Sequence, residues 1–331
     1  MNSAIQTDCF HILALSGGGF KGLFTATVLE ELENDFGHPI AKKFDLIAGT
    51  SIGGIIALAL ALEIPAKEIK AVFIENGEKI FSRYKNIFHY LSNGYFLYSK
   101  YENIGLRECL KTLFGDKKIG GLKHRIIVPT VNYTKGSPQV LKTRHHKSFK
   151  KDIRWDLVDA AQATSAAPYY FPFFRNTEGD FIDGGIAANH PGLFAVIEAQ
   201  QFLDIPLNNI YQLHIGTLSQ KFTSSGKYDI YRSGLMQWNK RIIDLLFSSQ
   251  ERSSDQILKF LLKERYNSID NVVTDEQAKS IGLDKVSETS KRILTQCANV
   301  ESQAFLGSEF YSIIKNHNAP EFIPIPLEQG E

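Results

Sequence analysis

The stretch Gly49-Thr50-Ser51-Ile52-Gly53 is the most informative one for the fold and for a reactive serine, because its spacing is Gly-x-Ser-x-Gly. That spacing places a serine on a sharp turn between a strand and a helix, with its hydroxyl exposed. The short apolar run 44–48 predicts a buried strand, and the run 52–62, rich in Ile, Leu and Ala, predicts a buried helix. Gly49 and Gly53 leave room for a strained turn and for close packing of helix on strand. Ser51 is therefore a candidate nucleophile.

A run of glycines earlier in the chain is the second informative feature. Residues 11–15 predict a strand, and Ser16-Gly17-Gly18-Gly19-Phe20-Lys21-Gly22 follows it before a predicted helix over 20–35. Glycines that open a helix expose backbone N–H groups beside the positive end of the helix dipole, which makes an anion site. Such a site suits a phosphate or the oxyanion of a tetrahedral acyl intermediate.

The same glycines also satisfy the dinucleotide-binding spacing Gly-x-Gly-x-x-Gly. That alternative needs an acidic residue at the end of the second strand, about twenty residues on. Asp45 lies near that distance but begins its strand, so an oxyanion site is favoured. A Walker loop is excluded because no Gly-Lys-Ser/Thr follows. A tight turn without a ligand stays open, although three consecutive glycines are costly for packing alone.

A serine nucleophile needs a base, and Asp183-Gly184-Gly185 supplies a carboxylate after a short apolar strand. His190 and His214 follow Asp183, so chain order leaves a Ser–His–Asp triad open. His190 lies in a loop-like stretch, and His214 lies inside the apolar run 210–215, where a buried structural histidine is expected. The alternative is a Ser–Asp dyad, in which Asp183 takes the serine proton directly.

Read in order, Gly-Gly-Gly-Phe-Lys-Gly, Gly-Thr-Ser-Ile-Gly-Gly and Asp-Gly-Gly resemble the motifs of the patatin-like phospholipases. The small-residue stretch 160–168 and the sequence Ala188-Asn189-His190-Pro191 resemble two further segments of that family. The resemblance extends over about residues 10–220. Gly216-Thr217-Leu218 departs from the Gly-Thr-Gly of many relatives, in a loop outside the catalytic motifs.

The resemblance implies a serine phospholipase with Ser51 as nucleophile and Asp183 as base. It implies oxyanion donors in the backbone of the glycine loop and a structural or electrostatic role for Lys21. The implied oxyanion residues are Gly17, Gly18 and Gly19, and the implied motif glycines are Gly22, Gly49, Gly53, Gly184 and Gly185.

The size of the chain, the spelling of its motifs and its added C-terminal part are similar to bacterial antiphage phospholipases. Those enzymes are switched on by cyclic dinucleotides from a partner nucleotidyltransferase, and they degrade the membrane of their own cell. The resemblance thus implies a cyclic dinucleotide activator. Between Lys227 and Arg265 basic and aromatic residues alternate, which suits phosphates and bases. We predict ligand contacts from Arg232, Lys240 and Arg241.

Other interpretations stay open. Five acidic residues share the stretch 227–265, so it also fits an ordinary charged helix surface. A constitutive lipid acyl hydrolase acting in lipid turnover, and a non-enzymatic module that holds an anion on the glycine loop, are the rival functions. The aromatic stretch 81–101 and the basic run 142–151 are candidate lipid contacts, with ordinary loops as the alternative.

Alternating strands and helices predict a three-layer α/β/α sandwich with a mostly parallel sheet over residues 1–220, the catalytic domain. Residues 221–331 are predicted to be mainly helical, without a convincing strand, and to pack on that core as a ligand-sensing region.

The composition of the chain limits the kinds of function that it can have. The 331 residues are 43% hydrophobic and 22% charged with a net charge of +1, which argues against binding of nucleic-acid polymers. No signal peptide or membrane-spanning run is apparent, so we expect a cytoplasmic protein that contacts phospholipid at the inner face of the cell membrane. Cys9, Cys109 and Cys297 form no metal or disulfide pattern, and we expect reduced thiols, no metal and no cofactor. A homo-oligomer is left open.

Overall fold

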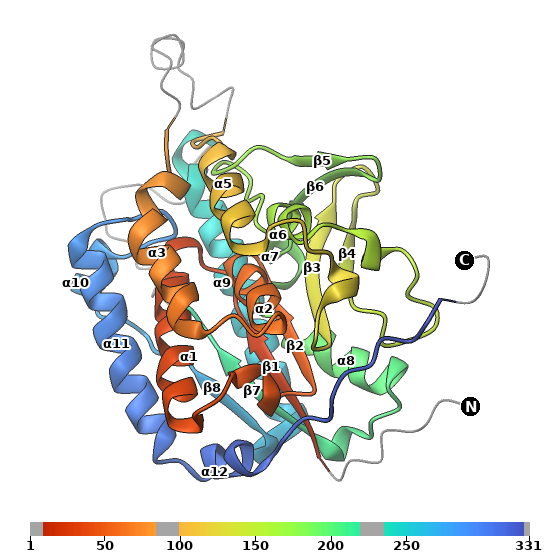
Figure 1. Ribbon diagram of the computed structural model, residues 1–331. Coiled ribbons are helices and arrows are strands. Elements are labelled where there is room, and N and C mark those ends of the chain that lie inside the picture. The colour runs from red at the N-terminus through yellow and green to blue at the C-terminus, as the bar shows by residue number, and fades with distance from the viewer. Residues whose placement is uncertain (1–8, 84–98, 219–234, 328–331) are drawn as a thin grey trace.

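A sheet of eight strands runs through the centre of the computed structural model, which describes residues 9–83, 99–218 and 235–327 and, within these, no side chains for 235–241 (Figure 1). The strand order is β5-β6-β3-β2-β1-β7-β8, and β4 pairs with β3. Neighbouring strands from β8 to β3 are parallel, whereas β4 and β6 run antiparallel to β3. The strands are β1 (Phe10–Leu15), β2 (Leu46–Gly49), β3 (Ile126–Asn132), β4 (Ser137–Lys142), β5 (Phe174–Asn176), β6 (Gly179–Asp183), β7 (Ile210–Ile215) and β8 (Tyr266–Ile269).

Helices cover both faces of this sheet, and several of them come after a strand in the chain. The predicted helices over 20–35 and 52–62 are each found within a few residues. The helices are α1 (Gly22–Phe36), α2 (Ile52–Ala61), α3 (Ala66–Ile80), α5 (Ile104–Phe114), α6 (Leu157–Thr164), α7 (Gly185–Ala188), α8 (Gly192–Phe202), α9 (Leu235–Leu262), α10 (Asp275–Ser280), α11 (Glu288–Leu306) and α12 (Glu309–Asn316).

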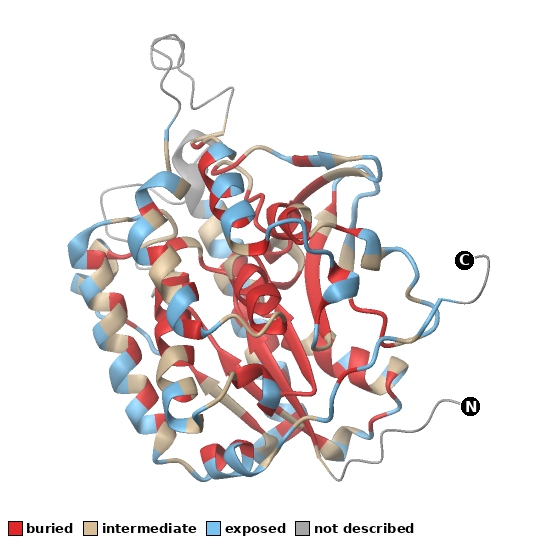
Figure 2. Ribbon diagram, viewed as in Figure 1, coloured by how far each residue is buried: buried red, intermediate tan, exposed pale blue. Residues whose placement is uncertain are grey.

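The two faces of the sheet bury separate cores, because successive side chains of a strand point to opposite sides. Leu13 and Ile47 pack with the helices α1, α2, α3, α5, α6 and α11. Ile12 and Leu46 pack on the other side with α8 and the end of α9. Figure 2 shows the central strands and the helix sides that face them as buried. The predicted three-layer α/β/α sandwich is confirmed.

The C-terminal region is more closely joined to the sheet than the sequence predicts. It is mainly helical, as expected, but β8 adds a parallel strand beside β7, with Ser268 opposite His214. The expectation of no strand after residue 220 is wrong at this point, because four residues of mixed polarity carry too weak a pattern to be recognised. Helix α11 lies beside α1 (Figure 1), so this region also completes one helical layer.

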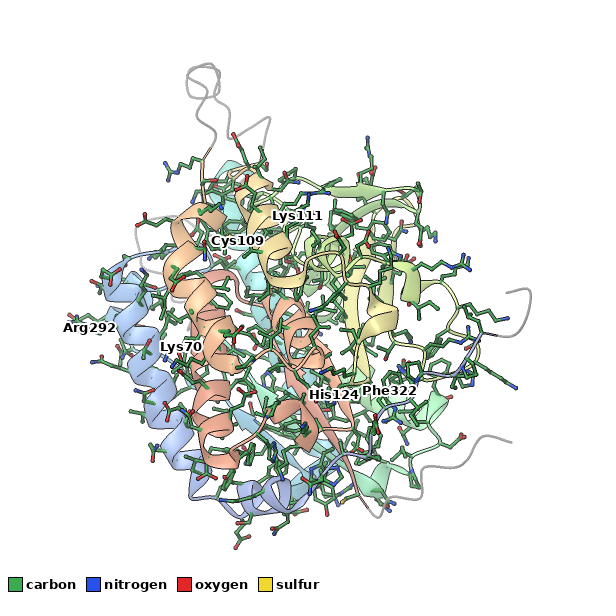
Figure 3. All side chains as sticks on the ribbon, in the orientation of Figure 1. Lys70, Cys109, Lys111, His124, Arg292 and Phe322 are labelled. Carbon is green, nitrogen blue, oxygen red and sulfur yellow. The ribbon has the colours of Figure 1, made fainter. Side chains whose placement is uncertain are left out.

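Residues 317–327 form an extended C-terminal strap along the amino-terminal edge of the sheet. The N–H of Ala319 donates to the carbonyl of Lys42 (2.8 Å), and the N–H of Ile325 donates to that of Arg144 (3.0 Å). The ring of Phe322, labelled in Figure 3, lies 5.2 Å from the guanidinium of Arg125. The strap therefore holds the end of the described chain to the entrances of the central strands.

Candidate active site

Ser51 occupies the turn between β2 and α2, as the sequence predicts. Its backbone has φ 54° and ψ −123°, a conformation that costs a residue with a side chain free energy. Its N–H donates to Thr164 Oγ1 (3.0 Å), which helps to hold the turn. A Cβ on Gly53 would lie 2.3 Å from the carbonyl oxygen of Leu15, so only glycine lets the first turn of α2 approach β1 this closely. Gly49 closes β2 directly before the turn.

Asp183 lies at the end of β6 and touches Ser51 from 132 residues away in sequence. Ser51 Oγ donates to Asp183 Oδ2 at 2.6 Å, and the N–H of Gly185 donates to Asp183 Oδ1 at 2.7 Å. The antiparallel pairing of β6 with β3 places Asp183 opposite Thr130, at the sheet edge where Ser51 lies. Gly184 and Gly185 then lead into α7. The structure thus brings the two predicted catalytic residues into direct contact.

The Asp183 carboxyl group is fully buried, and this burial dominates its acidity. Burial raises the pKa of Asp183 to about 7, against the opposing effect of the hydrogen bonds from Ser51 and Gly185. No cation of the described residues contributes to this pKa. A carboxylate with a pKa near the working pH accepts a proton from serine more readily than an ordinary aspartate does.

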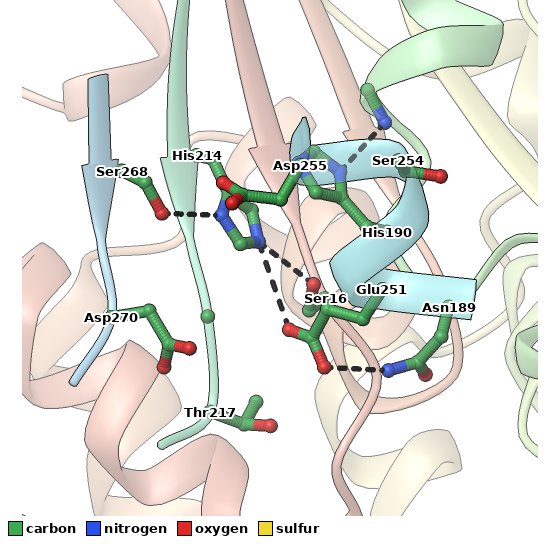
Figure 4. Close-up of polar contacts among 12 residues, drawn as sticks. Ser16, Asn189, His190, His214, Thr217, Glu251, Ser254, Asp255, Ser268 and Asp270 are labelled. Carbon is green, nitrogen blue, oxygen red and sulfur yellow. Dashed lines mark hydrogen bonds and ion pairs between the residues drawn. The ribbon is translucent and has the colours of Figure 1, made fainter. Parts of the chain in front are cut away.

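The two histidines considered as bases are bonded to other groups (Figure 4). The ring nitrogens of His214 lie 2.8 Å from Ser16 Oγ and 2.8 Å from Ser268 Oγ. The ring of His190 stacks on that of His214 at 3.8 Å, and its Nε2 lies 3.0 Å from the hydroxyl of Tyr266. Burial lowers the pKa of His214 to about 3 and that of His190 well below its usual value. Their place in a buried network favours the dyad over a triad.

The glycine loop passes directly beside the serine. A Cβ on Gly17 would lie 3.1 Å from Ser51 Cβ and 2.4 Å from Asn189 Oδ1. The N–H of Gly17 donates to the carbonyl of Asn189 (3.1 Å), so in this structure it is not open to a substrate oxygen. Asn189 in turn donates from Nδ2 to Glu251 Oε2 (3.2 Å), which links the loop to α9 (Figure 4). Asn189 is therefore a positioning residue for the loop.

The next two glycines carry the open donors. Among the described residues, no protein acceptor receives the N–H of Gly18 or of Gly19, whereas that of Phe20 donates to the carbonyl of Leu283 (2.7 Å). Gly19 has φ 57°, and a Cβ there would lie 2.2 Å from the oxygen of Leu283, so this position needs glycine. Of the three predicted oxyanion donors, Gly18 and Gly19 are thus available. Gly22 then begins α1.

An apolar cavity opens beside Ser51 and Asp183. Together with its mouth it encloses about 870 Å³, and most of its walls are aliphatic or aromatic side chains. Cys109, labelled in Figure 3, contributes from α5. Sequence reasoning missed the walls that α3 and α5 supply, although their spacing along these helices is visible in the sequence. Phe81, from the aromatic stretch considered as a lipid contact, also lines the cavity. The wall residues of α3 are Ile69, Val72, Phe73 and Ile80, and those of α5 are Leu106, Cys109, Leu110 and Leu113.

A family model described as patatin-like phospholipase matches residues 13–196, the span from the strand before the glycine loop to beyond Asp183. The chain belongs to the patatin-like phospholipase family. The resemblance drawn from five short motifs is therefore confirmed, and membership makes the chain a lipid-hydrolysing enzyme.

Two relatives of this patatin-like phospholipase share almost its whole length, and a third shares about three quarters of it. It is 44% identical to a cGAMP-activated phospholipase of Pseudomonas aeruginosa over 94% of the chain and 93% of the relative. It is 32% identical to a cGAMP-activated phospholipase of Vibrio cholerae over 96% and 95% of the two chains. A cUMP-AMP-activated phospholipase of Escherichia coli is 28% identical over 76% of this chain and 78% of its own. The similarity to nucleotide-activated bacterial phospholipases is confirmed.

Several predicted contacts of this patatin-like phospholipase fall outside the described residues. They are Arg232, the side chains of Lys240 and Arg241, and most of the aromatic stretch, 84–98. The basic run 142–151 lies within the described residues. Two of its members, Lys142 and His145, hydrogen-bond to Glu198, so these two have a structural role. Lys21 is structural too, since its Nζ donates to the carbonyl of Leu218 (3.1 Å).

No helix of the described ranges combines the length and the apolar character that crossing a bilayer requires.

Proposed function

We propose that this enzyme hydrolyses ester bonds of membrane phospholipids with a Ser51–Asp183 dyad. The observation that carries the proposal is the 2.6 Å hydrogen bond from Ser51 Oγ to Asp183 Oδ2 at the wall of an apolar cavity. The cavity supplies the apolar surface that an acyl chain needs, and the dyad lies where the ester carbonyl of that chain would sit.

In the proposed reaction, Asp183 accepts the proton of Ser51 as the serine oxygen attacks the ester carbonyl. The carbonyl oxygen becomes an oxyanion and accepts hydrogen bonds from the N–H groups of Gly18 and Gly19. The ester bond then breaks, and the proton passes from Asp183 to the oxygen of the departing lysolipid. Water, activated by the same carboxylate, cleaves the acyl-serine and releases a fatty acid. Gly17 shapes the loop and could donate only after its bond to Asn189 breaks.

We further propose that a cyclic dinucleotide switches the enzyme on, as the names of its relatives say of them. Helix α9 supports this, because it connects two parts of the site. Phe247 lies in the cavity wall, and Glu251, one turn later, bonds to Asn189 beneath the glycine loop. A ligand held by Arg232, Lys240 and Arg241 would act at the start of this helix. Any shift of α9 would reach the cavity and the loop together.

We also propose roles for the two parts of the chain and a place of action in the cell. Residues 1–220 would act as the catalytic domain and residues 221–331 as the ligand-sensing region. The enzyme would act at the inner face of the cell membrane, as a peripheral protein on phospholipid, and degrade that membrane in antiphage defence. A partner nucleotidyltransferase would supply the activator.

The test is fatty-acid release from phospholipid vesicles by the full chain, with and without a panel of cyclic dinucleotides. We expect release with one nucleotide and loss of that release in Ser51→Ala. Ser312→Ala is the matched control, because Ser312 is exposed on α12 and lies outside the cavity. Equal release without any nucleotide would reject the activator and keep the hydrolase. Equal release by Ser51→Ala would reject the dyad.

A further inference from the structure

Three potential metal ligands meet at the amino-terminal edge of the sheet, far from each other in sequence. Cys9 precedes β1, His11 lies in β1, and His317 begins the C-terminal strap. One donor atom from each lies within 4.8 Å of the other two. Cys9 Sγ and His317 Nδ1 are 3.7 Å apart, close to the separation of sulfur and nitrogen ligands around one tetrahedral ion.

The ring of His11 stacks on that of His317 with centroids 3.9 Å apart, but this packing does not satisfy its two nitrogens. His11 is 1% exposed, and neither of its ring nitrogens has a hydrogen-bond partner in the described structure. Buried polar atoms are almost always paired, so two unpaired nitrogens on one ring point to a missing partner. A neutral imidazole keeps a lone pair on one ring nitrogen, which is what a metal ion requires.

Asp45 orients the second histidine. Its Oδ2 lies 2.8 Å from His317 Nε2 and accepts the backbone N–H of His11 at 2.7 Å. A carboxylate accepts at Nε2, so the tautomer that suits this contact has its proton on Nε2 and its lone pair on Nδ1, the nitrogen nearest Cys9. A carboxylate behind a histidine is the usual arrangement at zinc sites, where it fixes the ring and raises its basicity.

We propose that Cys9, His11 and His317 bind one Zn²⁺ ion, with Asp45 holding His317 from behind. A thiolate with two imidazoles suits zinc better than magnesium or calcium, which prefer oxygen ligands. The thiolate and the Asp45 carboxylate together balance the two charges of the ion. Lys43 is the nearby cation, and its ammonium is already directed to Lys315 O (2.7 Å) and Asn318 Oδ1 (2.9 Å).

The site would act as a clip in the fold. It joins the start of β1 to the C-terminal strap, across 308 residues of chain. Ser51 follows the carboxyl end of β2, at the opposite edge of the sheet, so the ion would take no part in the dyad chemistry. An ion that binds only the folded chain stabilises it by mass action, and its loss would loosen the strap first.

The test uses the full chain, stripped of metal and then titrated with Zn²⁺ or Co²⁺. We expect one ion per chain by elemental analysis, a higher unfolding midpoint with zinc, and a thiolate-to-cobalt charge-transfer band in the visible and near-ultraviolet spectrum. Cys9→Ser should lose that band, and Asp45→Asn should weaken binding about 10- to 100-fold. Cys297→Ser is the matched control, since Cys297 lies on α11 away from the cluster, and it should keep both ion and band.

Two results would overturn the proposal. One is a wild-type chain that binds no stoichiometric zinc or cobalt. The other is a cobalt spectrum without thiolate character, or one that Cys9→Ser leaves unchanged. If Cys9→Ser does not fold, His317→Gln carries the test, because it changes a strap residue beyond the last helix. Retention of full affinity in His317→Gln would count against the site in the same way.

Discussion

Asp183 and Glu198 are both buried carboxylates, but their neighbours give them opposite chemistry. Glu198 on α8 accepts from Lys142 Nζ at 2.7 Å and from His145 Nε2 at 2.9 Å. Burial acts to raise its pKa, yet the bonds from His145 and Lys142 prevail and the pKa of Glu198 is lowered. Asp183 has only a hydroxyl and one backbone N–H as partners, and its pKa rises to about 7.

The comparison shows what turns a buried carboxylate into a base. Burial alone works against the charged form, and a cationic partner restores it. Glu198 is thereby a stable anion that holds β4 against α8, whereas Asp183 stays ready to take a proton. The absence of a cation beside Asp183, among the described residues, is thus as important to the proposed dyad as the serine itself.

Removal of the Asp183 charge should have the largest effect. Asp183→Asn keeps the shape of the side chain but cannot accept the serine proton, so fatty-acid release should fall by about 10²- to 10⁴-fold. The matched change Glu198→Gln should leave release within about twofold, because Glu198 acts on the fold and not on substrate. Vesicle assays of both variants under activating conditions make the measurement. Substantial activity in Asp183→Asn would mean that another group takes the proton.

The pH profile should reveal the same carboxyl group. Protonation of Asp183 removes the base, so kcat/KM should fall about tenfold per pH unit below a pKa near 7 and level off above it. The rate is measured on neutral phospholipid vesicles, and circular dichroism at each pH checks that the fold persists. A flat profile between about pH 5 and 7, with the fold intact, would contradict the raised pKa.

Glu198→Gln should lower the free energy of unfolding and leave the activity nearly unchanged. It leaves the ammonium of Lys142, 13% exposed, without its anion, so the free energy of unfolding should drop by about 2 kcal/mol, less than for a fully buried pair. Urea denaturation gives the difference. A second variant, Lys142→Met with Glu198→Gln, removes both charges and should recover part of the loss. No change in either variant would show that the pair contributes nothing to the fold.

The smallest effect is expected from the support of the serine turn. Thr164 Oγ1 accepts from the N–H of Ser51 and donates to the carbonyl of Pro129 (2.6 Å). Thr164→Val should cost about 1 kcal/mol of unfolding free energy and slow release severalfold, because the turn loses one partner. Thr112→Val on the exposed face of α5 is the control and should be nearly neutral. Equal behaviour of the two variants would show that the bond does not position Ser51.

Local chemistry explains which parts of this molecule the sequence reveals. The turn at Ser51 and the carboxylate at Asp183 are each marked by adjacent glycines, so a few consecutive residues predict the geometry. The hairpin of β3 and β4 is likewise marked by Gly136 in the four-residue connection 133–136, before the first paired residue of β4, Ser137. The parallel layers follow from the alternation of apolar strands and helices.

Long-range features leave no such mark. Strand β8 follows a long helix and carries two polar residues in four, so only its pairing with β7 reveals it. The contact of Asn189 with Glu251, and the use of the Gly17 N–H by Asn189, depend on the position of α9. Cys9, His11 and His317 come together only because the strap returns to the entrance of β1. No spacing rule in the sequence connects residues so far apart.

The backbone of Ser51 has a consequence for how this enzyme can evolve. A serine held at φ 54° lies in a region that glycine tolerates best, and such a residue costs about 1–3 kcal/mol. The proposed nucleophile thereby weakens the fold that presents it. Selection for catalysis and selection for thermal resistance oppose each other at this one residue, and substitutions elsewhere in the core must make up the difference.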